Sequence, residues 1–194
     1  FMADGTLRLV YAGAVTPTYD LGVALEAMAA IRAARPELAL ALDVYGRGDA
    51  TEALVVRAAE LGLDRTVRFH GRIPIEAVPA ALGSADVGIA PVPASAFTQL
   101  SFSTKLLEYG AMGLPVVAAR LPLAERLLGE AVALYEPGDP ASLAAAILDL
   151  VDDPDARLRR VDLMAGRVRE LSWEAWQDRY LQLIDRLARR GHDA

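Results

Sequence analysis

The chain has 194 residues, of which 54% are hydrophobic and 24% charged, so it is long and apolar enough to fold as one packed domain. Because it contains no Cys and only two His, disulfide scaffolds and cysteine nucleophiles are excluded and a thiolate or histidine metal centre is disfavoured. Its 26 acidic and 20 basic residues give a net charge of −6, which argues against a nucleic-acid-binding protein.

The first ninety residues alternate short apolar runs with longer segments of helical periodicity. The short runs predict strands, over residues 7–12, 38–45, 67–70 and 87–90. The periodic segments between them predict helices over residues 21–34, 51–61 and 75–82. Pro36 ends the first helix and Gly62 the second, because proline cannot continue a helix and glycine commonly closes one.

The rest of the chain contains two further strands and ends in a run of helices. The pattern predicts a helix over 103–112, strands over 115–118 and 131–134, and three helices over 142–151, 155–171 and 173–190. Ser172 is a suitable N-cap for the last helix. One face of that helix is apolar, which predicts that it is buried in the core or, in part, against a missing domain. This stripe consists of Trp176, Tyr180, Leu183 and Leu187.

Strand–helix alternation of this kind predicts the α/β class. We expect a doubly wound, Rossmann-like six-stranded parallel sheet with helices on both faces and a helical C-terminal segment, forming one domain over residues 1–194. Ligands of such sheets bind outside the carboxyl ends of the strands. That rule directs attention to residues 13–21, 46–49, 70–73 and 91–105.

The sequence predicts a cytoplasmic chain without a membrane span. Residues 1–5 lack the basic and apolar regions of a secretory signal. The longest uncharged stretch, from Val87 to Thr104, contains two prolines and several Ser and Thr, which are unfavourable in hydrocarbon. A weak membrane association through a missing partner region is the alternative.

The segment around Ser103, Thr104 and Lys105 has the features of a phosphate site. A polar loop enters a helix there, and free amides at a helix start attract anions. Lys105 is the single Lys beside 19 Arg, which is either chance or the mark of a place where a compact ammonium is preferred to a planar guanidinium. Glu108 follows one turn later and could accept two hydrogen bonds from a ribose diol. The alternative is a surface Lys–Glu pair with a Ser cap, although Lys before Glu is the poorer orientation for such a pair.

Three further stretches lie at predicted strand ends. Gly13 follows the first strand and permits close approach of a ligand to the backbone. Arg47 is flanked by two glycines, and His70 is followed by Gly71 and Arg72. Each has a structural alternative, namely a turn glycine, a solvated arginine or a hydrogen-bonding histidine. The absence of a G-x-G-x-x-G pattern argues against a nicotinamide or flavin dinucleotide.

The order of these motifs resembles the carboxyl-terminal half of the group 1 glycosyltransferases, which have the GT-B fold. The resemblance covers nearly the whole chain, and its most specific part is KLLEYGAMGLPVV at residues 105–117. The other matching landmarks are the first strand with Gly13, DVYGRG at 43–48, VRFHGRIP at 67–74, SADVGIAP at 84–91 and SWE at 172–174.

The resemblance implies a site for a nucleotide-diphosphate sugar and a retaining, hexosyltransferase-type reaction without a metal or other cofactor, in polysaccharide or glycoconjugate biosynthesis. By this likeness Glu108 holds the donor ribose. Gly13 lies under the diphosphate and sugar. Gly71 and Arg72 line the nucleobase, and Ser103, Thr104 and Lys105 lie at the diphosphate.

Two departures from the family pattern bear on this site. Many members have a Glu that contacts the transferred sugar, and here that position is Leu100. The family also often has two cations in the first loop and following helix start, where this chain has Ala14-Val15 and Asp20-Leu21. We therefore expect the phosphate charge to rest on Lys105, Arg47 or Arg72 and on backbone amides.

The resemblance also implies that this chain is one half of an enzyme. The missing amino-terminal domain would bind the acceptor, would contact the helix over 172–190 and could associate peripherally with a membrane. We expect the isolated chain to bind a nucleotide sugar weakly, to transfer no sugar and to bind no nucleic acid. Two alternatives remain: a degenerate glycosyltransferase-like interaction module, and a nucleotide-sugar epimerase, for which the loop over 91–103 offers no acid or base.

Overall fold

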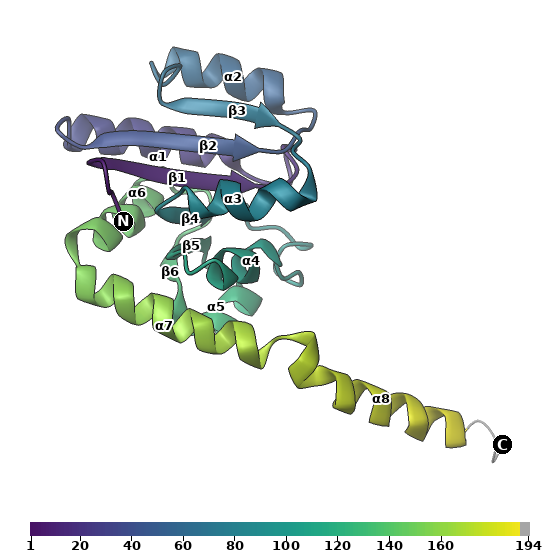
Figure 1. Cartoon of the computed structure of the whole chain (residues 1–194). Coiled ribbons are helices and arrows are strands. Elements are labelled where there is room, and N and C mark those ends of the chain that lie inside the picture. Colours follow the sequence, from purple (N-terminus) through teal and green to yellow (C-terminus); the bar gives the residue numbers. More distant parts are fainter. Residues whose placement is uncertain (191–194) are drawn as a thin grey trace.

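The computed structural model, which describes residues 1–190, contains one six-stranded parallel sheet (Figure 1). The strands follow the order β3-β2-β1-β4-β5-β6. Two halves of the sheet therefore extend in opposite directions from β1 and β4, as expected of a doubly wound sheet. The strands are β1 (Thr6–Ala12), β2 (Ala39–Tyr45), β3 (Val67–Gly71), β4 (Val87–Ala90), β5 (Val116–Ala119) and β6 (Ala133–Tyr135).

Helices cover both faces of the sheet. They are α1 (Leu21–Ala34), α2 (Thr51–Glu60), α3 (Val78–Gly83), α4 (Lys105–Ala111), α5 (Pro122–Leu128), α6 (Pro140–Asp152), α7 (Pro154–Glu170) and α8 (Trp173–Arg190). Helix α1 packs against α2 and α6, whereas α4 packs against α7 on the other side of the sheet (Figure 1). This arrangement confirms the predicted fold class. The last four residues, which include the second histidine, lie outside the described part of the chain.

Local sequence signals explain where the helices begin. The Asp20 carboxylate accepts a hydrogen bond from the Val23 amide and so caps α1. Asp139 and Asp153 cap α6 and α7 in the same way, each directly before a proline. Asp is a favourable N-cap and proline suits the first helical position, where its missing N–H would have had no partner. The Asp20 cap sets the start of α1 directly after the loop that follows β1.

Two predicted helices differ from the structure, and one helix of the structure was not predicted. The helix predicted over 75–82 is a 3-10 turn at residues 75–77 followed by α3, because Pro79 has no N–H to bond the carbonyl of Ile75. The helix predicted over 103–112 is shorter, since Ser103 and Thr104 lie in the turn before α4. Helix α5 was not predicted: it has seven residues, too few for a clear helical period.

Helix α8 projects away from the body of the domain (Figure 1). The Ser172 hydroxyl accepts a hydrogen bond from the Ala175 amide, as predicted for an N-cap. The prediction that the stripe is buried in the core is wrong, because Trp176, Tyr180, Leu183 and Leu187 are each about half exposed. An apolar helix face without a partner is unusual in a folded domain. No helix within residues 1–190 is long and apolar enough to cross a membrane.

We expect a chain that ends at Ser172 to unfold within about 2 °C of the full chain, because α8 contributes little buried surface. Thermal unfolding followed by circular dichroism tests this. As a control, a chain that ends at Asp153 also lacks α7, which buries Met164 and packs against α4, and it should unfold far earlier. A large loss of thermal stability on removing α8 alone would contradict the expectation.

Candidate functional site

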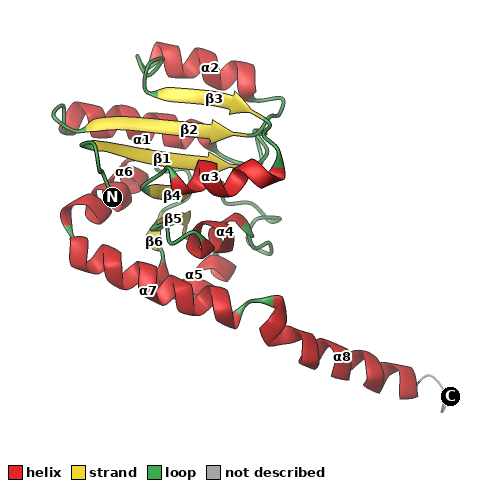
Figure 2. Cartoon of the chain, viewed as in Figure 1, coloured by secondary structure: helices red, strands yellow, loops and turns green. Residues whose placement is uncertain are grey.

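The edge of the sheet at the carboxyl ends of the strands, which we call the rim, is open between β1 and β4. The arrowheads of β1, β2 and β3 point to the same side of the molecule, where the loops gather (Figure 2). Because β1 pairs with both β2 and β4, the strand order reverses at this point, and ligands of doubly wound sheets bind there. The loops that follow β1 and β4, residues 13–20 and 91–104, border this opening.

Backbone hydrogen bonds join the loops that follow the first three strands. The Gly13 amide donates to the Tyr45 carbonyl at 2.9 Å, and the Gly46 amide donates to the Gly71 carbonyl at 2.8 Å. The Val15 amide donates to the Arg47 carbonyl at 3.2 Å. The loops therefore form one surface.

Gly46 permits the closest approach in this surface. Its φ is +138°, and a Cβ added there would lie 1.7 Å from the Gly13 carbonyl oxygen. Only glycine fits such a position. The glycines around Arg47, a weak signal in the sequence, are thus explained by packing between loops.

Three fully buried tyrosines form hydrogen bonds with the backbone of the rim. The Tyr11 hydroxyl donates to the Ala14 carbonyl at 2.6 Å. The Tyr109 hydroxyl accepts from the Ala12 amide at 2.9 Å, and the Tyr135 hydroxyl accepts from the Val92 amide at 3.3 Å. Burial raises the pKa of all three phenols above its ordinary value. They stay neutral and hold the loops after β1 and β4 in place.

Two hollows meet on this rim. The first, which we call the arginine hollow, measures about 390 Å³, and the second, the lysine hollow, about 280 Å³. Both are lined by Gly13 and Glu108. Arg47 and Arg72 line only the arginine hollow. The lysine hollow is also lined by Tyr19, Phe102, Ser103, Thr104 and Lys105.

The structure thus brings together seven of the eight residues singled out in the sequence. Gly71 lines neither hollow; its carbonyl bonds the Gly46 amide instead. His70 also lines neither hollow. Its Nε2 lies 2.6 Å from Asp43 Oδ1, and its ring stacks on Tyr45 with the ring centroids 4.5 Å apart. Of the two interpretations of His70, the geometry fits the structural one.

Lys105 is the most unusual side chain of the rim. It is only 7% exposed, and its Nζ makes no ion pair or hydrogen bond with any residue of the described chain. Instead Nζ lies 3.7 Å from the centroid of the Tyr19 ring and 4.9 Å from that of Tyr11. Burial lowers the pKa of Lys105 to about 8, and the Glu108 carboxylate opposes this shift. A charged amine is thus held without any carboxylate in ion-pair contact with it in the described chain.

Lys105 also lies directly against Gly13. A Cβ added to Gly13 would be 3.0 Å from Lys105 Cε and 3.2 Å from Nζ. A side chain at residue 13 would therefore press on the lysine that passes over it. This contact joins the ends of β1 and α4 in one site.

Glu108 lies where the two hollows meet. Its side chain is exposed, and the Thr104 hydroxyl donates to its Oε1 at 3.4 Å. Lys105 and Glu108 form no ion pair, and Thr104 rather than a serine is the N-cap residue of α4, without a side-chain cap. The alternative of a surface Lys–Glu pair with a Ser cap is therefore wrong. The carboxylate remains free to accept hydrogen bonds from a ligand.

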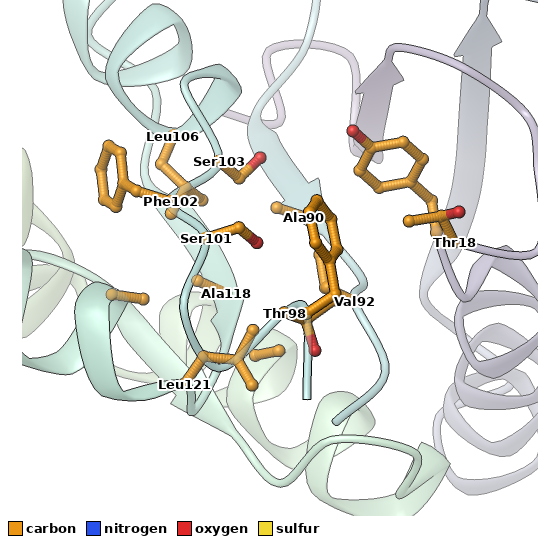
Figure 3. A pocket seen from close by; sticks show the side chains of 14 residues that line it. Thr18, Ala90, Val92, Thr98, Ser101, Phe102, Ser103, Leu106, Ala118 and Leu121 are labelled. Atoms are coloured by element: carbon orange, nitrogen blue, oxygen red, sulfur yellow. The ribbon is translucent and has the colours of Figure 1, made fainter. Parts of the chain in front are cut away.

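The sequence did not single out Tyr19, which lines both the lysine hollow and a third pocket. This pocket measures about 150 Å³ and lies between the loops after β1, β4 and β5. Figure 3 shows Ser101 and Ser103 on one side of it and Thr18 on the other. Most of its other walls are apolar, among them Val92, Phe97, Leu106 and Leu121. Leu100, the position of the family Glu, does not line it and is 83% exposed.

Comparison with known proteins identifies relatives of this chain. The chain is 32% identical over 178 residues to D-inositol 3-phosphate glycosyltransferase of Corynebacterium jeikeium, covering 88% of this chain and 41% of that protein. It is 31% identical over 177 residues to phosphatidyl-myo-inositol mannosyltransferase of Mycobacterium leprae, covering 90% and 45%. The chain thus spans less than half the length of these relatives.

Solved structures share the fold. Anabaena HepE in complex with UDP and glucose superposes with a TM-score of 0.80 at 18% identity, covering 93% of this chain and 48% of that one. The catalytic domain of cholesterol-alpha-glucosyltransferase from Helicobacter pylori gives a TM-score of 0.71 at 20% identity, covering 86% and 99%. At these identities the likeness establishes the fold alone.

A family model settles the assignment. The model described as "Glycosyl transferases group 1" matches residues 6–153. That range includes all six strands, both hollows and the KLLEYGAMGLPVV motif. The predicted resemblance is thereby confirmed, and the chain belongs to the group 1 glycosyl transferases.

Proposed function

We propose that this chain is the donor-binding half of a retaining, metal-independent glycosyltransferase of the hexosyltransferase type. Its ligand is a nucleotide-diphosphate sugar, which spans the arginine and lysine hollows. HepE, which shares the fold, was solved with UDP and with UDP-glucose. A single observation carries the proposal: the ammonium of Lys105 is buried beside Gly13 without any anionic partner in the described chain.

The diphosphate belongs in the lysine hollow. A buried charge without a partner is costly, and an entering phosphate supplies the missing counter-charge. The hydroxyls of Ser103 and Thr104 line the same hollow and can donate to phosphate oxygens. The departing nucleoside diphosphate gains negative charge during sugar transfer, and the fixed, largely buried ammonium of Lys105 stabilises that charge.

The nucleoside belongs in the arginine hollow. Glu108 lies at the boundary of the two hollows, and its carboxylate can accept both hydroxyls of a ribose diol. Tyr45, Arg72 and Ile73 also line this hollow, and we assign the base to them. Arg47 also lines this hollow and adds positive charge to it.

The acceptor half lies outside this chain, which spans 41% and 45% of two relatives. We therefore propose that the isolated chain binds a nucleotide sugar but transfers no sugar. In the whole protein, the apolar stripe of α8 packs on the amino-terminal domain. This packing explains why each residue of the stripe is about half exposed here. Release of nucleoside diphosphate by this chain alone, with an acceptor present, would overturn that division of labour.

The ribose contact gives a test of the proposal. Glu108→Gln keeps the shape of the side chain but removes its charge, so we expect about tenfold weaker binding of the preferred nucleoside diphosphate, the loss typical of one charge-assisted hydrogen bond. The 2′,3′-dideoxy analogue lacks the diol and should bind both proteins equally. Isothermal titration calorimetry with UDP, GDP, ADP and TDP first identifies the base.

The matched control is Glu52→Gln, an exposed glutamate on α2 that lines neither hollow. It should leave all affinities unchanged. If Glu108→Gln weakens the affinity for the ribose and dideoxy ligands equally, the assigned contact between Glu108 and the ribose is contradicted. If no nucleoside diphosphate binds the folded chain at all, the alternative of an interaction module is favoured, in keeping with the exposed Leu100.

A further inference from the structure

We propose that Tyr19 is a positioning residue for phosphate recognition: its ring holds the ammonium of Lys105 over Gly13, so that the two side chains act as one unit. The inference rests on the proposed function and deepens it. Tyr19 belongs to the loop between β1 and α1, which contains no basic residue. The cation that lines the lysine hollow, Lys105, comes from α4 instead, and the loop contributes an aromatic face to it.

The two tyrosines form a box around the amine. Nζ lies closer to the Tyr19 ring than to the Tyr11 ring, at 3.7 Å and 4.9 Å from their centroids. The rings themselves meet edge to face, with centroids 6.2 Å apart and an interplanar angle of 61°. Tyr11 is fully buried and held by its bond to Ala14. Tyr19 is the outer wall of the box and decides whether the amine stays inside.

An aromatic wall suits an anion site better than a carboxylate would. A carboxylate beside Lys105 would cancel its charge and compete with phosphate. The face of a tyrosine attracts a cation through its quadrupole but has no net charge. The ammonium is thus oriented while its positive charge remains available to a ligand. Without the ring, the flexible four-carbon stem of lysine would let the amine turn toward solvent or Glu108.

The backbone around Tyr19 is itself held in place by hydrogen bonds. Its amide donates to the Thr16 carbonyl at 2.9 Å, which closes a turn in the loop. The neighbouring Asp20 amide donates to the Pro91 carbonyl at 3.2 Å, and the Asp20 carboxylate caps α1. The ring is therefore anchored both to α1 and to the end of β4. The Tyr19 hydroxyl makes no hydrogen bond within residues 1–190, so the ring face is the part that acts.

The single lysine makes the inference directly testable. In protein labelled with ¹³C at lysine Cε, the one Lys signal reports on Lys105, and a ring face above it shifts the attached protons upfield. We expect that shift in the unaltered chain and in Tyr19→Phe, and its loss in Tyr19→Leu. Calorimetry with the preferred nucleoside diphosphate should show at least fivefold weaker binding by Tyr19→Leu and recovery by Tyr19→Phe. Circular dichroism checks that each variant is folded.

A double-mutant cycle separates positioning from a direct contact. If Tyr19 acts through the amine, Tyr19→Leu should have no further effect on affinity in a Lys105→Met background. Tyr180→Leu, an exposed tyrosine on α8, is the matched control and should bind as the unaltered chain does. Unchanged affinity in Tyr19→Leu, or an equal loss in the Lys105→Met background, overturns the inference while the proposed function stands. If the unaltered chain binds no nucleotide, both the inference and the proposed function are overturned. The lysine signal then shows only whether the rings of Tyr11 and Tyr19 enclose the amine.

Discussion

Lys105→Met is expected to make the domain more stable at pH 7 and to abolish most of its affinity for nucleoside diphosphates. Met fills similar space without a charge. Burial lowers the pKa of Lys105 from 10.5 to about 8, which corresponds to a penalty of roughly 3 kcal/mol for the charged form. The attraction of the two rings returns up to about 2 kcal/mol, so we expect a net gain of about 1 kcal/mol in the free energy of unfolding, measured with urea.

The pH dependence of stability isolates the same residue. The pKa of Lys105 is lower in the folded chain than in the unfolded chain, so between pH 8 and 10.5 the unfolded state binds more protons and stability rises with pH. Burial raises the pKa of Tyr11, Tyr109 and Tyr135, so these phenols ionise first in the unfolded state and lower stability above about pH 10. The rise is therefore visible from pH 8 to 10, and Lys105→Met should lack it. The same slope in both proteins would contradict the assignment.

Lys105→Met should weaken the binding of nucleoside diphosphates although it makes the domain more stable. A desolvated ammonium that meets a phosphate contributes about 1.5–3 kcal/mol, so removing it should weaken binding by roughly tenfold to a hundredfold. In the unaltered chain, affinity should fall as pH rises through about 8, because the amine loses its proton. Arg120→Met, which breaks an exposed pair with Glu125, is the control and should alter neither affinity nor its pH profile. A variant that gains stability and loses binding would show that the fold tolerates this charge for the sake of its ligand.

Much of the fold could be predicted because its signals are local. Apolar runs mark all six strands, and Pro36, Gly62 and Ser172 mark helix boundaries that the structure retains within about two residues. The single Lys and the acid three residues later could be predicted as a site for the same reason, since both lie on one turn of α4. The errors fall where local signals are weak, as in the seven residues of α5.

The partners of Lys105 could not be predicted, because they depend on which strands are neighbours. Tyr11 and Tyr19 meet residue 105 only because β4 lies beside β1, and periodicity does not reveal strand order. The exposure of α8 was missed for a related reason. An apolar stripe such as that of Trp176 and Tyr180 reports that a face will be buried but does not report by what.

Gly46→Ala is expected to have the largest effect on the fold, a loss of about 4 kcal/mol or more in the free energy of unfolding. The new Cβ would lie 1.7 Å from the carbonyl oxygen of Gly13. Both groups belong to the backbone of the rim, so no rotation of a side chain relieves the overlap. The loops after β1 and β2 must separate, which breaks the bond from the Gly13 amide to Tyr45.

A matched glycine separates this overlap from backbone strain. Gly138 has a φ of +77° and open space where a Cβ would be, so Gly138→Ala should lose only about 1 kcal/mol, the penalty of a left-handed alanine. Urea and thermal unfolding of the two variants give the comparison, and equal losses would contradict the steric account. Because Lys105 lies across Gly13, a Gly46→Ala chain that does fold at low temperature should also bind nucleoside diphosphate more weakly, since moving Gly13 removes the surface on which the ammonium is held.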